Sequence, residues 1–113
     1  MRTYYPKYIE KEVYNRTLSV ARSYFDDLKK IKILKNENKS IEFKRQIELL
    51  EYRTQAVEKT LSEFNEEERK AINQNIIKGI PIINCNVNLS ERSIITLRKE
   101  FIKNLAINLG ELI

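Results

Sequence analysis

Apolar side chains recur at helical spacing through the first 64 residues and predict two long amphipathic helices. We expect the first to run from Pro6, which suits a first helical turn, to about Leu34. Its inward positions are Ile9, Val13, Thr17, Val20, Tyr24, Leu28 and Ile31. In the second helix, spacings of 4 and 3 alternate as in a coiled-coil heptad. Its inward positions are Phe43, Ile47, Leu50, Thr54, Val57, Leu61 and Phe64.

The link between these two helices, residues 35–40, is short and polar, and Ser40 suits the N-cap of the second helix. Two long helices joined in this way are expected to fold back as an antiparallel hairpin. The same apolar seam would also suit a coiled coil between two chains. A homodimer is therefore an alternative to packing within one chain.

Residues 65–113 carry start and stop signals of further helices. Asn65 and Glu68 have the spacing of a capping box, and Gly79 suits the left-handed position that follows a helix end. Pro81 then suits the first turn of a short helix over residues 81–87, barely two turns long.

A last helix is expected from Glu91 to about Leu109, with Ser90 as its cap and Gly110 as its stop. Three helices with a short middle one and two tight connections outline a helix-turn-helix unit. We therefore predict an all-α fold with about five helices, divided into an N-terminal hairpin (residues 1–64) and a helix-turn-helix unit (residues 65–113).

The predicted last helix has two faces. The apolar face would pack on the preceding helices and carries Ile94, Leu97, Phe101 and Leu105, with Leu109 close by. The opposite face would point outward and carries Arg92, Thr96, Lys99 and Lys103. This is the arrangement of a recognition helix, although any amphipathic helix has a charged outer face.

Two stretches, SEFNEEERKAINQ and NLSERSIITLRKEFIKNLAINLGELI, resemble the C-terminal half of phage late-gene transcription activators of the RinA and ArpU type. The resemblance is carried by the acidic start at residues 66–69, the cap at residues 90–93, the step at residues 97–99 and the ending at residues 105–110. Those activators are similar in turn to the helix-turn-helix of sigma factors. The opening YYPKYIEKEVYNRTLS resembles RinA-type proteins and, more faintly, a family of small uncharacterised mollicute proteins.

The outer face and the resemblance together predict a phage-related, DNA-binding transcription regulator that reads the major groove with the helix 91–109. Arg92 and Thr96 would be nearest to the base edges, and hydroxyls at the helix start would anchor phosphate. The N-terminal hairpin would hold a partner subunit or RNA polymerase. The predicted DNA-binding residues are Ser90, Arg92, Ser93, Thr96, Lys99 and Lys103.

The distribution of charge favours a second hypothesis. The net charge is +5, but residues 1–40 carry ten Lys or Arg against five Asp or Glu, whereas residues 65–113 carry seven against six. A nearly neutral helix-turn-helix unit, a short middle helix and a heptad seam favour a protein-interaction module or an RNA-polymerase-binding accessory protein.

Two basic clusters outside the last helix have two interpretations each. Tyrosines near the start could stack on bases or could pack against the C-terminal unit. They are Tyr4, Tyr5, Tyr8 and Tyr14, interleaved with Arg2, Lys7, Lys11 and Arg16. A lysine run could contact phosphates or could be a solvated helix end. It consists of Lys29, Lys30, Lys32, Lys35 and Lys39.

Residue types that usually carry catalysis are scarce. The chain has no His and no cluster with metal-ligand spacing, so we expect no enzyme activity, no metal and no cofactor. Asp26 and Asp27 are adjacent in a helix and are expected to be solvated rather than paired, and Cys85 is expected to be a small buried hydrophobe. The chain has neither a signal peptide nor a transmembrane stretch, which predicts a cytoplasmic protein with no membrane partner.

Overall fold

The computed structural model describes residues 9–37 and 41–111. This part of the chain is all-helical, as predicted, and contains five α-helices and no strand. The α-helices are α1 (Lys11–Arg22), α2 (Tyr24–Glu37), α3 (Ile41–Leu61), α4 (Glu66–Ile72) and α5 (Glu91–Asn108). A π-helical turn, η1 (Asn73–Ile77), continues α4, and a 3-10 turn, η2 (Ile82–Asn84), precedes α5. The predicted roles of Pro6 and Ser40 lie outside the described residues.

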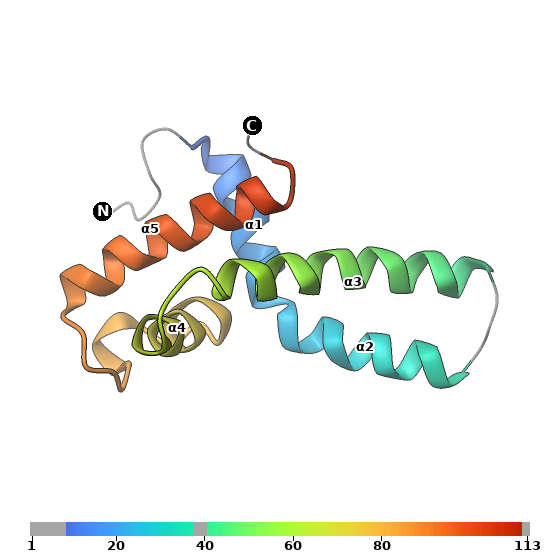
Figure 1. The fold of residues 1–113 in the computed structure, drawn as a ribbon, viewed down its shortest axis with the longest axis horizontal. Coiled ribbons are helices and arrows are strands. Elements are labelled where there is room, and N and C mark those ends of the chain that lie inside the picture. Colours follow the sequence, from blue (N-terminus) through green and yellow to red (C-terminus); the bar gives the residue numbers. More distant parts are fainter. Residues whose placement is uncertain (1–8, 38–40, 112–113) are drawn as a thin grey trace.

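The prediction of one long first helix is wrong, because the chain breaks at Ser23. The Ser23 hydroxyl and its backbone N–H both donate to the carbonyl of Ser19, at 2.8 and 3.0 Å, a bonding pattern that bends helices. The first helix also begins later than predicted, at Lys11, because Glu10 is extended. The two helices on either side of the break have different neighbours: α1 packs mainly against α5, whereas α2 lies along α3 (Figure 1).

Helices α2 and α3 lie side by side and run in opposite directions, extending away from the rest of the molecule (Figure 1). Thr54 and Val57, which lie in the half of α3 near the core, are buried, as their heptad positions predict. Leu50, nearer the far end, is only half-buried. The Tyr24 hydroxyl donates to Glu58 at 2.6 Å, and Lys35 forms an ion pair with Glu51 at 3.4 Å. These polar contacts join the two helices along their length.

The core is built around the apolar face of α5. Phe101, Ile102 and Leu105 are fully buried there, and the Phe64 and Phe101 ring centroids are 6.1 Å apart. Buried side chains from α1, α3, α4 and η1 join the same cluster, including Ala21, Val57, Ile72 and Ile76. The predicted division of the chain at residue 64 stays a prediction, and residues on both sides of it share this core.

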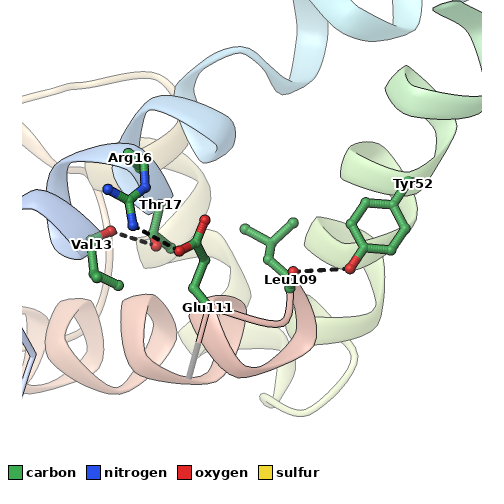
Figure 2. Close-up of polar contacts among 6 residues, drawn as sticks. All are labelled: Val13, Arg16, Thr17, Tyr52, Leu109 and Glu111. Carbon is green, nitrogen blue, oxygen red and sulfur yellow. Dashed lines mark hydrogen bonds and ion pairs between the residues drawn. The ribbon is translucent and has the colours of Figure 1, made fainter. Parts of the chain in front are cut away.

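The C-terminal end of α5 is bonded to two other helices (Figure 2). Arg16 of α1 forms an ion pair with Glu111 at 2.8 Å, and the Tyr52 hydroxyl of α3 donates to the carbonyl of Leu109 at 2.9 Å. Gly110 has a φ of +81°, so the predicted stop after the last helix is confirmed. These bonds fix the direction of α5 relative to α1 and α3.

Candidate nucleic-acid interface

The start of α4 is held by the predicted capping box. The Asn65 side chain accepts from the backbone N–H of Glu68 at 2.8 Å, and the Glu68 carboxylate accepts from the backbone N–H of Asn65 at 3.0 Å. Arg69 donates to the carbonyl of Phe64 at 2.6 Å. The helix therefore begins at a well-defined residue and places its acidic first turn beside the start of α5.

The end of this helical segment is a π-helical turn. The N–H of Lys78 bonds to the carbonyl of Asn73 at 3.0 Å, and Gly79 follows with a φ of +71°. This positive φ confirms the predicted left-handed glycine. Glycine suits the position because any other side chain would be strained there. The π turn was not predicted. Such turns are frequent at functional sites.

The predicted short helix over residues 81–87 is wrong. The chain makes one 3-10 turn, η2, and none of its residues is buried. Ile83 is 79% exposed. Asparagine recurs at positions 84, 86 and 88 and favours turns over helix, and the backbone N–H groups of Asn86 and Asn88 bond to the side chains of Gln74 and Glu67 instead of to helical carbonyls. Residues 80–89 therefore form an irregular connector where the sequence predicted a scaffold helix.

Three polar side chains of α4 and η1 attach this connector to the helix beneath it. Asn75 donates to the carbonyl of Ile80 at 2.9 Å. The Gln74 amide makes two bonds to the backbone of Asn86, accepting from its N–H at 2.7 Å and donating to its carbonyl at 3.2 Å. Glu67 accepts from the backbone N–H of residue 88 at 3.0 Å. The connector is therefore fixed both by these hydrogen bonds and by apolar side chains, such as Val87 and Leu89, that pack against the core.

Ser90 caps α5, as predicted. Its hydroxyl accepts from the backbone N–H of Ser93 at 3.1 Å and donates to the Ser93 hydroxyl at 3.0 Å. The two hydroxyls that were predicted to anchor phosphate thus lie together at the start of α5, and both residues are exposed. A helix start that presents amides and hydroxyls to solvent is suited to bind an anion.

The outer face of α5 is only partly as exposed as predicted. Arg92 and Thr96 are exposed, on the first two turns. The Thr96 hydroxyl donates to the carbonyl of Arg92 at 3.1 Å. Lys99 and Lys103 are half-buried, so the prediction that all four residues are exposed is wrong for these two. The later turns of α5 are flanked by other elements, because α5 packs against α1 and α3 (Figure 1).

Acidic side chains flank the predicted contact face. A cleft of about 370 Å³ is lined by Arg92, Thr96 and Ser93 of α5 and also by Glu68 and Glu100. The Glu68 carboxylate already accepts from the backbone N–H of Asn65 in the capping box. This face can receive a base edge or a phosphate at Arg92, but it does not form a strongly positive surface.

The described members of the two other basic clusters have different environments. Tyr14 is buried, and its hydroxyl accepts from Nε of Arg98 at 2.7 Å, which favours the packing interpretation for this tyrosine. The lysines of α2 that are described are exposed: Lys29, Lys30, Lys32 and Lys35. Lys11 and Arg16 are also exposed. The other predicted residues lie outside the described part of the chain: Arg2, Tyr4, Tyr5, Lys7, Tyr8 and Lys39.

The prediction that both Asp26 and Asp27 are solvated is wrong for Asp27. Asp26 is exposed, but Asp27 is only 3% exposed, and one of its carboxylate oxygens has no hydrogen-bond partner. Burial raises the pKa of the Asp27 carboxyl, although Arg53 and Lys30 act in the opposite direction. Cys85 is half-buried beside the core, and burial raises the pKa of its thiol. A thiol with a raised pKa is a poor nucleophile.

Comparisons of the chain with protein families, with curated proteins and with solved structures found no match. No group of three His, Cys, Asp or Glu in residues 9–37 and 41–111 is arranged to hold a metal ion. Within the same ranges, no helix is both long enough and apolar enough to cross a membrane.

Proposed function

We propose that this protein is a DNA-binding transcription regulator with a degenerate helix-turn-helix, in which the connector after Gly79 replaces the scaffold helix. The observation that supports the proposal is the way in which the start of α5 is exposed and held in place. Its first turns expose Arg92 and Thr96, and its start is fixed by Ser90 and by the bonds of the connector. Recognition helices contact bases with the residues of their N-terminal turns.

In this proposal, the N-terminal half of α5 enters the major groove. Arg92 donates to a guanine edge, and Thr96 packs its methyl group against a thymine. Ser90 and Ser93 bond a phosphate at the helix start, and Lys99 and Lys103 lie toward the backbone of the duplex. The resemblance to phage late-gene activators of the RinA and ArpU type supports a regulatory role, and it stays a proposal.

The charge of this face determines what kind of binding to expect. Lys99 and Lys103 would neutralise about two phosphates, so the logarithm of the binding constant should fall with a slope of about −1.8 against the logarithm of the salt concentration. Glu68 and Glu100 beside them weaken non-specific attraction. Base contacts must therefore supply a larger share of the affinity than in a strongly basic protein.

A selection experiment tests this function. Duplexes that bind the native protein are enriched from a random library at low salt, and the winners are measured by fluorescence anisotropy. We expect a defined motif and salt-dependent binding that weakens with Arg92→Ala. Lys44→Ala is the matched control, because Lys44 is an exposed cation in the first turn of α3 and this end of α3 lies away from α5 (Figure 1). Enrichment of no motif would contradict the proposal.

A second candidate function, a protein-interaction module, is favoured by the exposed apolar side chains of the α2–α3 hairpin. Ile33 is 53% and Leu49 54% exposed, and together with Leu34 and Leu50 they line a cleft of about 330 Å³. Exposed apolar side chains that cluster in this way are typical of a protein contact. Sedimentation equilibrium of the wild type and of Leu49→Asp tests whether this surface joins two copies of the chain: a dimer that Leu49→Asp dissociates supports the candidate.

A further inference from the structure

A cleft on another side of α5 contains two arginines and is independent of the proposed DNA contacts. It measures about 410 Å³ and lies between the end of α1, the connector and the start of α5. Arg22 and Arg98 line it, together with Glu91 and with Ile80, Ile83 and Ile95. This volume falls within the range of clefts that hold a small ligand or a few side chains. We refer to it as the Arg22–Arg98 cleft.

Arg98 is held in place by two buried side chains. Its Nε donates to the Tyr14 hydroxyl at 2.7 Å and its Nη1 donates to Oδ1 of Asn75 at 3.3 Å. Its guanidinium carbon lies 6.0 Å from the centre of the Tyr14 ring. Tyr14 and Asn75 are 5% and 3% exposed. The guanidinium is therefore positioned before any ligand arrives, which lowers the entropy that binding must overcome.

Arg22 brings a second guanidinium to the same cleft. Its Nε lies 3.9 Å from the point that a Cβ at Gly79 would occupy, so the side chain rests against the connector. Arg22 is exposed, and it has no hydrogen bond or ion pair with any described residue. Among the described residues of the lining, Glu91 is the single acidic one against the two arginines, so this part of the lining carries a net positive charge.

The walls of the cleft are aliphatic. Ile80 and Ile95 are half-buried, and Ile83 at the rim is 79% exposed. A duplex phosphate would pair with the charge of the arginines but would leave the isoleucine side chains without apolar partners. A carboxylate next to an aliphatic side chain satisfies both, because guanidinium groups bind carboxylates through paired hydrogen bonds and isoleucines bury apolar surface.

We propose that the Arg22–Arg98 cleft binds a short segment of a partner protein that carries acidic residues beside Leu or Ile. Arg98 lies about 120° around α5 from Arg92, so the segment and DNA contact different sides of the helix. The binding of such a segment therefore does not depend on the proposed function, and either can fail alone.

The test is a titration followed by ¹H–¹⁵N correlation spectra of the whole chain. The probe is the acetylated, amidated peptide Leu-Glu-Glu-Leu, and its matched control is Leu-Gln-Gln-Leu. We expect saturable shifts of the Gly79 and Ile83 amides at millimolar acidic peptide and much weaker shifts with the control peptide. Arg22→Gln should weaken binding about fivefold, the upper end for an exposed ion pair, and Glu91→Gln should strengthen it.

A variant away from the cleft separates local from global charge effects. Arg45→Gln removes one exposed cation of α3 and should leave the affinity for the peptide unchanged. Absence of shifts at the cleft with the acidic peptide would overturn the proposal, as would equal binding of both peptides. Displacement of the peptide by a short mixed-sequence duplex would assign the cleft to nucleic acid instead and would also overturn it.

Discussion

Asp27→Asn should stabilise the protein at neutral and alkaline pH. Asp27 is 3% exposed with one unpartnered oxygen, and burial raises its pKa above the ordinary value of 3.8 despite Arg53 and Lys30. Below pH 3.8 the carboxyl is protonated in both the folded and the unfolded state, and its charge costs nothing. As the pH rises above 3.8, the Asp27 carboxyl ionises in the unfolded chain before it ionises in the folded protein. The wild type therefore loses stability until the pH exceeds the raised pKa of Asp27 in the folded protein.

The size of this effect follows from the charge of the carboxylate, because asparagine keeps a polar atom at the unpartnered position. Burying a polar group without a partner costs about 1–3 kcal/mol, and more when the group is charged, and the attraction of Arg53 and Lys30 offsets part of the cost of the charge. We therefore expect the Asp27→Asn substitution to add about 1–2 kcal/mol to the free energy of unfolding above neutral pH. For a chain of this length, that corresponds to a rise in Tm of roughly 5–10 °C.

The assay is thermal unfolding followed by circular dichroism at a series of pH values for the wild type, Asp27→Asn and Asp26→Asn. Asp26 is an exposed neighbour in the same helical turn, so its variant controls for the loss of one negative charge. The Tm difference between wild type and Asp27→Asn should shrink as the pH falls toward 3.8. If Asp27→Asn is less stable than wild type at pH 8, the carboxylate has a stabilising partner and the reasoning is wrong.

Three further predictions concern the parts that position α5. Gln74→Ala removes both bonds to Asn86 and should cost about 1–2 kcal/mol, with faster hydrogen exchange at the Asn86 amide. Gly79→Ala places a side chain at a φ of +71° and should cost about 1–2 kcal/mol in chemical denaturation, whereas Asn84→Ala in the exposed turn should cost little. Val57→Asp buries a charge at a fully buried site and should abolish cooperative unfolding, whereas Leu49→Asp at a 54% exposed site should keep it.

Local signals in the sequence are sufficient to predict several ends of the helices. The capping box at Asn65, the cap at Ser90 and the left-handed glycines at Gly79 and Gly110 all occur where they were predicted. Each depends on one or two neighbouring residues, so the chain carries the information within a few positions. The apolar face of α5 is confirmed for the same reason, because it depends on helical spacing alone.

Features that depend on distant contacts could not be predicted from spacing. The break at Ser23 leaves the apolar period of the first helix unchanged, so only the packing of α1 on α5 reveals it. The connector is fixed by Gln74 and Asn75, whose only signal in the sequence is that they belong to three successive amides, residues 73–75, within an apolar run. Asp27 is buried near the start of α2, where this helix leaves α1 and meets α3, and the spacing of residues carries no sign of that meeting.

The exposure of Arg92 and Thr96 on the first turns of α5 is the basis of the proposed function, and salt-dependent binding to the selected duplex tests it most directly. The account predicts that Arg92→Ala reduces discrimination between the selected and a mutated duplex by about 1–3 kcal/mol. Lys99→Ala should weaken binding to both duplexes and flatten the salt slope by about one unit, whereas Lys44→Ala should change neither. Wild-type protein that binds no duplex at low salt, or an Arg92→Ala variant that discriminates as the wild type does, would contradict the account.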